Sequence, residues 1–166
     1  MDESELREFV HMHYPRLVGA LALVCGSRAT AEDVVQEALA RAWERSLRGG
    51  KVESLAAWVT TVSLNLTRSH LRRLRTERRA RPLLTGRPHD DVSLTDAQID
   101  LRRALAALPR RQREATVLRY YLDLDVLEIS RVMETPEGTT KSLLARARAT
   151  LARALRTEDA REVREY

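Results

Sequence analysis

Arginine is the side chain with the most binding chemistry to offer in this sequence. The 166 residues include 29 basic side chains, of which only Lys51 and Lys141 are lysines. The positive charge gathers in two blocks: residues 48–88 hold ten basic and two acidic side chains, and residues 139–157 hold five basic and no acidic ones. Guanidinium groups bind phosphates and base edges through paired hydrogen bonds, which lysine cannot form. The blocks favour a polyanion as partner, although any single arginine can equally serve a solvated, salt-bridged helix face.

The second basic block belongs to a helix-turn-helix pattern at about residues 125–150. A short helix is predicted to end at Met133, a turn over 134–138 follows, and Thr139 is predicted to cap a longer basic helix. In such a pair the first residues of the second helix enter the major groove of DNA. A helical hairpin with a solvated basic face is the alternative, and the lack of acids over 139–157 weighs against it. The residues expected to face DNA are Thr139, Thr140, Lys141, Ser142, Ala145 and Arg146.

The first basic block contains an asparagine whose amide needs partners. Asn65 lies between Val62 and Leu66 in a helix predicted over 54–73, on a mainly apolar surface. A buried amide is hydrogen-bonded either within the protein or to a ligand, so Asn65 is either a core residue or a contact to a nucleotide base. The arginines that could track a phosphate backbone next to it are Arg68, Arg72, Arg73, Arg75, Arg78 and Arg79.

A third pattern is the outer face of a helix predicted over 31–45. Apolar residues recur there at steps of three and four, from Ala31 to Trp43, and the opposite side is polar. Glu37 and Arg41 stand one turn apart and can form an ion pair. An acidic outer face is usually only solvated, so the pattern is weak by itself. Its polar members are Glu32, Asp33, Gln36, Glu37 and Arg41.

Catalytic chemistry has little support in the sequence. The four histidines, at positions 11, 13, 70 and 89, have no cysteine pair or Glu-x-x-His spacing beside them, so we expect no metal site, no catalytic residue and no cofactor. Cys25 is a single thiol, which favours a reducing cytoplasm and a packed side chain rather than a nucleophile. No apolar run is long enough for a transmembrane helix, and the acidic start is no signal peptide.

The composition predicts an all-α fold. Only 4% of the residues are aromatic, and the chain has just six glycines and five prolines. The helical pattern stops over residues 79–95, which contain two prolines and a glycine and are predicted to form a flexible linker. We therefore expect two small helical domains, 1–78 and 96–157, each of four helices and the second with the helix-turn-helix, and a tail at 158–166.

Local signals set the expected helix limits and core. Pro15 either kinks a helix over 4–25 or ends a short first helix, and Thr30 is expected to cap the next one. Trp43 and Trp58 lie in apolar stripes and are expected in the core. The helix before the linker is predicted to bury Leu55, Trp58, Val62 and Leu66.

Several stretches of the sequence occur in an order that is typical of one protein family. They are Ala31-Glu32-Asp33-Val34-Val35-Gln36-Glu37-Ala38, Trp58, Asn65, Arg72-Arg73, Leu108-Pro109-Arg110-Arg111-Gln112-Arg113-Glu114 and Gly138-Thr139-Thr140-Lys141-Ser142. The set resembles an extracytoplasmic-function (ECF) type bacterial RNA polymerase sigma factor of the sigma-70 family, over nearly the whole chain. The resemblance implies a region-2 domain at 1–78 and a region-4 domain at 96–157.

The resemblance also implies which residues bind polymerase and which bind −10 DNA. The helix that docks on the clamp helices of the polymerase's largest subunit is matched by Asp33, Gln36, Glu37 and Arg41. Asn65 matches the residue that helps to hold a flipped base of the non-template strand in the −10 element. The loop 48–53 would line the same pocket and contributes Lys51. The −10 set is completed by Arg68, Arg72 and Arg73.

Upstream recognition is implied in the same way. The positions that read the −35 element are matched by Thr139, Lys141, Ser142 and Arg146. Ser69 stands where Asp is common, Ser130 where Ala is usual and Leu143 where Arg is usual, and Ala145 is smaller than the side chain often found there. These departures leave the family intact and leave the promoter sequence open.

The predicted function is that of a promoter-specificity subunit. It binds core polymerase, recognises −35 and −10 DNA and helps to melt the start site in the cytoplasm, without membrane insertion, and the resemblance suggests an anti-sigma factor as a further partner. A stand-alone helix-turn-helix regulator is the first alternative, but it would leave the acidic helix face and Asn65 without roles. A small hydrolase or nuclease is the second, and it would need a carboxylate or histidine cluster that the sequence does not offer.

Overall fold

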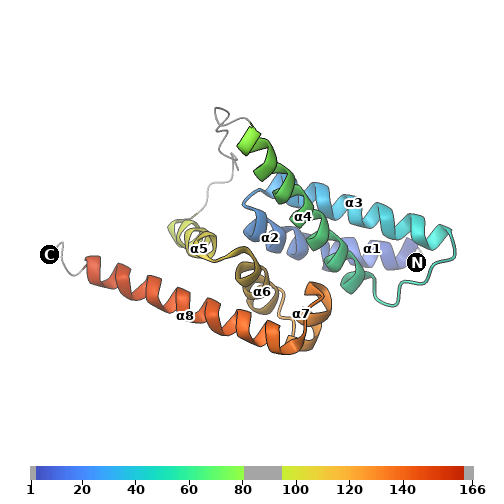
Figure 1. Cartoon of the computed structure of the whole chain (residues 1–166). Coiled ribbons are helices and arrows are strands. Elements are labelled where there is room, and N and C mark those ends of the chain that lie inside the picture. The colour runs from blue at the N-terminus through green and yellow to red at the C-terminus, as the bar shows by residue number, and fades with distance from the viewer. Residues whose placement is uncertain (1–2, 81–94, 163–166) are drawn as a thin grey trace. The chain divides into compact units, whose positions relative to one another are not determined.

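The computed structural model describes the backbone of residues 3–80 and 95–162, and the side chains of 3–77 and 97–154 together with that of Thr95. Within those ranges the chain forms eight α-helices and no strand (Figure 1). The all-α prediction is therefore confirmed.

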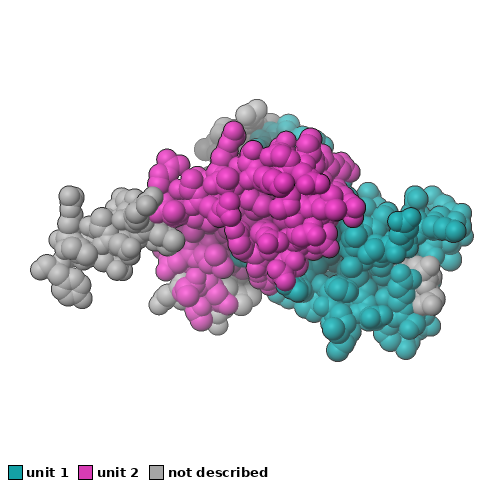
Figure 2. Space-filling model, turned by 90° about the horizontal axis from the view of Figure 1, so that it is seen from below, with its two compact units in different colours: residues 1–92 teal, residues 93–166 magenta. Residues whose placement is uncertain are grey.

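The helices divide between two compact units, residues 1–92 and 93–166 (Figure 2). Each unit holds four of the helices that the structure describes, as the sequence predicts. The predicted linker 79–95 falls mostly on residues 81–94, which lie outside the described residues. The flexible linker therefore stays a prediction.

The first break in the N-terminal unit is set by a proline. α1 (Glu3–Met12) ends before Pro15, and α2 (Tyr14–Cys25) takes the proline into its first turn, where a missing N–H costs no hydrogen bond. Of the two outcomes that the sequence left open, the short first helix is correct. α3 (Arg28–Leu47) and α4 (Leu55–Ala80) follow, and α3 packs against both α2 and α4.

Small side chains line the buried face of α3. Ala31, Ala38 and Ala42 have zero exposure, as do Val18 of α2 and Val59 of α4. The side chains at a helix contact set the distance between the axes, so alanines allow α3 to approach its neighbours closely. An interior packed in this way has no room for long charged side chains. These side chains therefore lie on the surface.

α3 begins at Arg28, earlier than predicted. Its N-cap is Ser27, whose Oγ accepts a hydrogen bond from the Thr30 N–H at 3.2 Å, so the prediction that Thr30 caps this helix is wrong. Ser and Thr are both capping residues, and the sequence offered two candidates three positions apart. Gly26 decides between them, because its φ of 80° ends α2 in the left-handed conformation and α3 starts directly afterwards.

α4 buries a different face from the predicted one. The buried residues of α4 are Leu55, Val59, Ser63, Leu64 and Thr67. Of the predicted inner face only Leu55 is buried, and the half-buried members are Trp58, Val62 and Leu66. The Thr67 hydroxyl donates to the Ser63 carbonyl at 2.8 Å, which satisfies its polarity within the helix. Thr67 can then occupy the helix contact as a small residue, and Ser63 lies in the same contact with its hydroxyl unpaired among the described residues.

The expectation that Trp43 lies in the core is wrong. Its side chain is 39% exposed, whereas the neighbouring Ala42 has zero exposure. Successive residues of an α-helix are about 100° apart around the axis. Since Ala42 points into the core, Trp43 is turned to the edge of the apolar stripe.

The C-terminal unit consists of α5 (Asp96–Ala107), α6 (Arg110–Tyr120), α7 (Val126–Met133) and α8 (Glu137–Glu162). α8 packs against α6 and α7, and α6 packs against α7. α5 and α7 begin with capping boxes, in which the cap side chain and the side chain three residues later bond each other's backbone N–H. The boxes join Thr95 to Gln98 and Asp125 to Glu128.

Two limits of α8 differ from the predicted ones. The helix begins at Glu137, so Thr139 lies inside its first turn and does not cap it. The predicted turn over 134–138 is correspondingly shorter. The helix also continues to Glu162, within the segment 158–166 that was predicted as a tail.

Replacing Ser27 by Ala removes the acceptor for the Thr30 N–H, and we expect it to lower the free energy of unfolding by about 1 kcal/mol. Thr30→Ala is the matched control and should change it by less than about 0.5 kcal/mol. Urea unfolding of the full chain, followed by far-ultraviolet circular dichroism, measures both. Equal losses in the two variants would contradict the cap assignment.

Candidate polymerase and DNA interfaces

The first turns of α8 separate a packing side from an open side. Thr140, Leu144 and Ala147 are buried, in the helix that contacts α6 and α7. The exposed side chains are Thr139, Lys141, Ser142, Ala145 and Arg146. The helix-turn-helix predicted at 125–150 is therefore present, and its second helix offers these five side chains to solvent. The expectation that Thr140 faces DNA is wrong, because its side chain has zero exposure and lies on the packing side.

Two of these exposed side chains already have partners within α8. Lys141 Nζ lies 3.9 Å from Glu137 Oε2, and Ser142 Oγ donates to the Gly138 carbonyl at 2.9 Å. The ion pair is solvent-exposed and therefore weak, so a phosphate can replace the carboxylate at little cost. The Ser142 oxygen keeps lone pairs that can accept a hydrogen bond.

A buried carboxylate on α6 supports the helix-turn-helix. Glu114 has zero exposure, its Oε1 lies 3.4 Å from Arg110 Nε, and its Oε2 lies 3.5 Å from Arg111 Nη1. Arg111 also donates from Nη2 to the Met133 carbonyl at 3.3 Å, at the C-terminal end of α7. The Arg111 guanidinium thus links α6 to the C-terminal end of α7, where the turn begins. The sequence offered a signal for this role, because Glu114 is the single acid among the four arginines of residues 110–119.

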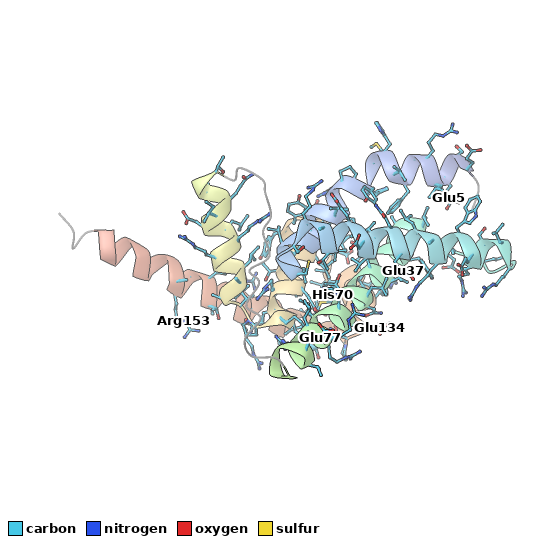
Figure 3. All side chains as sticks on the ribbon, turned by 90° about the horizontal axis from the view of Figure 1, so that it is seen from above. Glu5, Glu37, His70, Glu77, Glu134 and Arg153 are labelled. Atoms are coloured by element: carbon cyan, nitrogen blue, oxygen red, sulfur yellow. The ribbon has the colours of Figure 1, made fainter. Side chains whose placement is uncertain are left out.

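The turn itself has a strained backbone residue. Glu134, labelled in Figure 3, is the C-cap of α7 and has φ 53°. This left-handed conformation costs an L-residue about 1–2 kcal/mol. The Arg111 contact to Met133, one residue earlier, holds the chain at the position where that strain arises.

The polar face of α3 is exposed as predicted. Asp33, Gln36, Glu37 and Arg41 all lie on the surface, and Glu37 is marked in Figure 3. Glu37 Oε1 accepts from Arg41 Nε at 2.8 Å, which confirms the expected ion pair one turn apart. Gln36 Nε2 lies 3.5 Å from the Tyr14 hydroxyl of α2. The face combines both charge signs with an amide, which suits a polar protein interface.

Asn65 is half-buried, at the margin of the face by which α4 packs. Its Oδ1 accepts a hydrogen bond from Arg68 Nη1 at 2.9 Å. Among the described residues no group accepts a hydrogen bond from its amide nitrogen. The side chain is thus fixed at its oxygen and offers two N–H donors to a ligand.

The next turns of α4 carry more exposed arginines. Arg72 Nη2 donates to Ser69 Oγ at 3.5 Å, and Arg73 Nε lies 3.7 Å from Glu77 Oε1. His70 and Glu77 are labelled in Figure 3 on the same helix. Both arginine contacts are exposed and weak, so the guanidinium groups can exchange them for phosphate.

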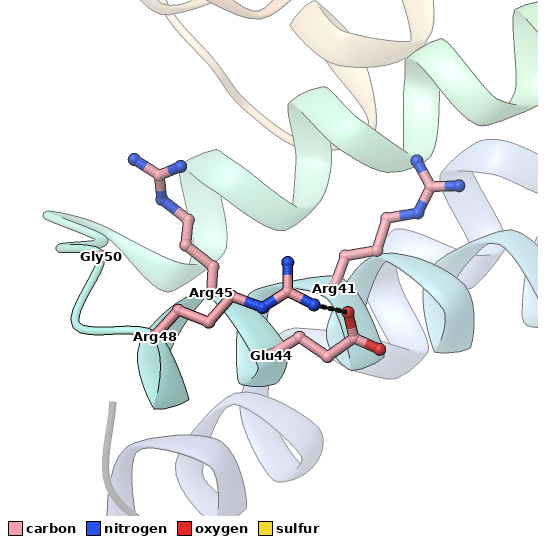
Figure 4. Close-up of a pocket in the computed structure, with 5 residues that line it drawn as sticks. All are labelled: Arg41, Glu44, Arg45, Arg48 and Gly50. Atoms are coloured by element: carbon pink, nitrogen blue, oxygen red, sulfur yellow. Dashed lines mark ion pairs between the residues drawn. The ribbon is translucent and has the colours of Figure 1, made fainter.

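The loop between α3 and α4 borders a pocket of about 430 Å³ that the sequence did not reveal (Figure 4). Its walls consist of Arg41, Glu44, Arg45, Arg48 and Gly50. Arg48 Nη2 pairs with Glu44 Oε2 at 3.6 Å, and the lining holds three arginines and one carboxylate, so it is positively charged. Arg41 belongs to the polar face of α3, and Arg48 and Gly50 belong to the loop. The pocket therefore connects these two predicted binding regions.

The same loop is bonded to the end of α3. The Gly50 N–H donates to the Arg45 carbonyl at 2.9 Å, and Arg45 Nε donates to the Lys51 carbonyl at 3.4 Å. A Cβ on Gly50 would lie 2.7 Å from Arg45 Cγ and 3.0 Å from the Arg45 carbonyl oxygen. Glycine is therefore required for this close approach. The exposed Lys51 side chain extends from a loop whose backbone is held in place.

The two units match two family models. Residues 9–77 match Sigma-70 region 2, and residues 98–151 match Sigma-70, region 4. SigL of Mycobacterium tuberculosis, an ECF RNA polymerase sigma factor, is 32% identical over 149 residues, which cover 86% of this chain and 84% of SigL. The chain belongs to the ECF RNA polymerase sigma factors.

Other sigma factors show the same relationship. BldN of Streptomyces coelicolor, also an ECF sigma factor, is 35% identical over 147 residues, but the match covers only 54% of BldN and 82% of this chain. The solved structure of the sigma factor RpoE with the anti-sigma factor NepR, from Bartonella quintana, gives a TM-score of 0.75 at 27% identity. It covers 93% of this chain and 98% of RpoE. The predicted family and the fold of two helical domains are confirmed.

The family places the candidate surfaces in different regions. The α3 face and Asn65 lie within the region 2 match, and the helix-turn-helix lies within the region 4 match. Sigma factors are transcription initiation factors rather than enzymes. Across the described residues, no three His, Cys, Asp or Glu side chains gather as metal ligands. In the same part of the chain, no helix is long and apolar enough to span a membrane.

Glu114→Gln keeps the shape of the side chain but removes the buried charge between Arg110 and Arg111. We expect it to destabilise the C-terminal unit by about 1.5–3 kcal/mol, the usual value of hydrogen bonds to charged groups. Glu137→Gln, which removes the exposed partner of Lys141, should cost less than about 0.5 kcal/mol. Amide hydrogen exchange of residues 110–133 compares the two. Similar protection in both variants would show that the Glu114 contacts do not stabilise this unit.

Proposed function

We propose that this sigma factor directs core RNA polymerase to promoters through three separate surfaces. The exposed side of α8 reads the −35 element, the α4 surface around Asn65 with the preceding loop binds the −10 element, and the polar face of α3 binds core polymerase. The observation that carries the proposal is the open side of α8 in a helix-turn-helix, where polar and basic side chains stand opposite a buried face.

Upstream recognition follows from the groups that α8 exposes. Arg146 can donate two hydrogen bonds to the O6 and N7 of a guanine, which is the most common specific contact in the major groove. Lys141 can leave Glu137 for a backbone phosphate, and Thr139 and Ser142 add hydroxyls. Arg146 therefore contributes base discrimination, and Lys141 contributes affinity that depends on salt.

Recognition of the −10 element rests on the orientation of Asn65. Arg68 donates to its amide oxygen, which leaves the two N–H donors of the nitrogen for a ligand. A base that leaves the stack presents its Watson–Crick edge to such donors. Lys51 and the arginines Arg68, Arg72 and Arg73 supply positive charge for the phosphates beside that base.

Binding to core polymerase uses the polar face of α3. Asp33, Gln36 and Glu37 are exposed, and Arg41 neutralises Glu37 at 2.8 Å in the free protein. An interface can replace this intrahelical pair by pairs with the partner at small cost, because both side chains are about half exposed. The pocket beside Arg41 lies next to this face and adds positive charge.

The proposed partners are core polymerase, promoter DNA and an anti-sigma factor, and the proposed place of action is the bacterial cytoplasm. RpoE, to which this chain is similar, was solved with the anti-sigma factor NepR. A stand-alone helix-turn-helix regulator would use α8 alone. The region 2 match, which includes the α3 face and Asn65, favours the sigma factor over that alternative.

Run-off transcription tests the function. Core polymerase with the full chain should give a defined start on DNA from upstream of its own gene, and core alone should not. Glu37→Ala should lower the product at low sigma concentration and recover at high concentration, because it weakens assembly rather than promoter recognition. Glu3→Ala, which breaks a comparable exposed pair with Arg7 on α1, is the control and should behave as the wild type. Tight sequence-specific DNA binding without core, and no run-off product with it, would support the regulator.

Asn65→Ala tests the base contact. It should leave assembly with core and −35 binding intact but lower open-complex formation, measured by permanganate reactivity of unpaired thymines. The defect should shrink on a template that is already mismatched over the −10 element, because unpairing costs a few kcal/mol less there. Ser69→Ala, which removes another acceptor of an arginine on α4, is the matched control. An equal defect on paired and mismatched templates would contradict the proposed role.

A further inference from the structure

Three hydroxyl groups lie in a row between α7 and the first turn of α8. Ser130 Oγ is 2.6 Å from the Val126 carbonyl oxygen and 2.9 Å from Thr140 Oγ1, and Thr140 Oγ1 is 3.1 Å from Thr135 Oγ1. Thr140 has zero exposure and Ser130 is 6% exposed, whereas Thr135 is half-buried. The row therefore runs from the turn into the interior, and we refer to it as the hydroxyl row.

Counting protons gives the hydroxyl row a direction. The Val126 carbonyl can only accept a hydrogen bond, so the Ser130 hydroxyl must donate its single proton to it to make the 2.6 Å contact. Thr140 then donates to Ser130, and Thr135 donates to Thr140. Each hydroxyl donates once, and the two buried ones also accept once. No proton of the row is left unsatisfied in the interior.

The hydroxyl row joins two elements that must keep a fixed angle. Ser130 belongs to α7, and Thr140 belongs to the turn of α8 that carries Thr139 and Lys141. Thr140 itself is buried and cannot touch DNA. A rotation of α8 about its axis would move Thr139 and Lys141 relative to the major groove of bound DNA. The Ser130–Thr140 hydrogen bond opposes such a rotation. Backbone contacts at the turn, such as the Thr140 N–H to the Pro136 carbonyl at 3.1 Å, do not link α8 to α7.

We propose that Ser130 and Thr140 are positioning residues for DNA reading: their hydrogen bond fixes the rotation of α8 on α7 and thereby the aim of its exposed side chains. The proposal rests on the proposed role of α8 at the −35 element. It goes beyond that role because neither residue contacts DNA. Its consequence is that specificity depends on a buried hydroxyl and not only on exposed groups.

Thr140→Val tests the proposal, because it keeps the volume of the side chain and removes only the hydroxyl. With the full chain assembled on core polymerase, we expect the preference for a promoter with an intact −35 element over one with a scrambled element to fall about fivefold. This is the net effect of one lost hydrogen bond converted to a ratio. Thr116→Val is the matched control, because Thr116 is also buried but its hydroxyl donates to the Gln112 carbonyl within α6 at 2.8 Å. It should leave the preference unchanged.

A second pair of variants separates positioning from stability. Thr140→Ser keeps the hydroxyl but loses a buried methyl group, so it should unfold at lower urea concentration than Thr140→Val and yet keep the promoter preference. Ser130→Ala and Thr140→Val break the same bond, so the double variant should lose no more preference than either single one. A preference that follows stability, or losses that multiply in the double variant, would overturn the proposal.

Hydrogen exchange distinguishes a failure of this proposal from a failure of the proposed function. If the bond fixes the first turn of α8, the amides of residues 140–144, whose hydrogen bonds close that turn, should exchange several times faster in Thr140→Val than in Thr116→Val, without any DNA present. Unchanged exchange would overturn the positioning role even if promoters are recognised. If exchange is faster in Thr140→Val but the wild-type protein shows no preference for an intact −35 element, the structural role of the hydroxyl bond stands. The proposed role of α8 in reading the −35 element is then rejected.

Discussion

The C-terminal unit depends on one buried carboxylate. Glu114 has no exposure, and burying a full charge is costly unless it is paired. Arg110 and Arg111, whose side chains are about one third exposed, compensate it at 3.4 and 3.5 Å while they keep contact with water. Arg111 also donates to the Met133 carbonyl, so the buried ion pair of α6 is connected to the C-terminal end of α7. The helix-turn-helix is supported by an ion pair on a third helix.

The N-terminal unit is organised by size rather than by charge. Alanines at zero exposure bring α3 close to its neighbours, and Ser63 and Thr67 do the same on α4. Such an interior excludes arginine and glutamate from the contacts. Charged side chains therefore lie on the outer face of α3 and on the later turns of α4, where they can contact a partner. The small buried side chains thus account both for the tight packing of the helices and for the position of the charged groups on the surface.

Helix number, helix type and the open side of α8 followed from the sequence because they depend on periodicity and on Gly and Pro positions, which are local signals. The errors arose where a residue type permits two environments. Ser27 and Thr30 can both cap a helix, and only the conformation of Gly26 separates them. Trp43 is apolar but lies about 100° from the buried Ala42, so hydrophobicity alone placed it wrongly. The pocket at Arg45 and Gly50 depends on loop geometry, for which the sequence holds no periodic signal.

The misplaced face of α4 bears directly on Asn65. A stripe through Leu55, Val62 and Leu66 would turn Asn65 toward the core, where its amide would need internal partners. The observed stripe instead runs through Ser63, Leu64 and Thr67, and the Thr67 hydroxyl is satisfied by the backbone of its own helix. Two small polar residues thus lie in the interior beside Leu64, and the larger amide is left at the margin, where Arg68 donates to its oxygen and no described residue accepts from its nitrogen. The position of the buried face of α4 is therefore what leaves the Asn65 side chain at the margin of the helix contact.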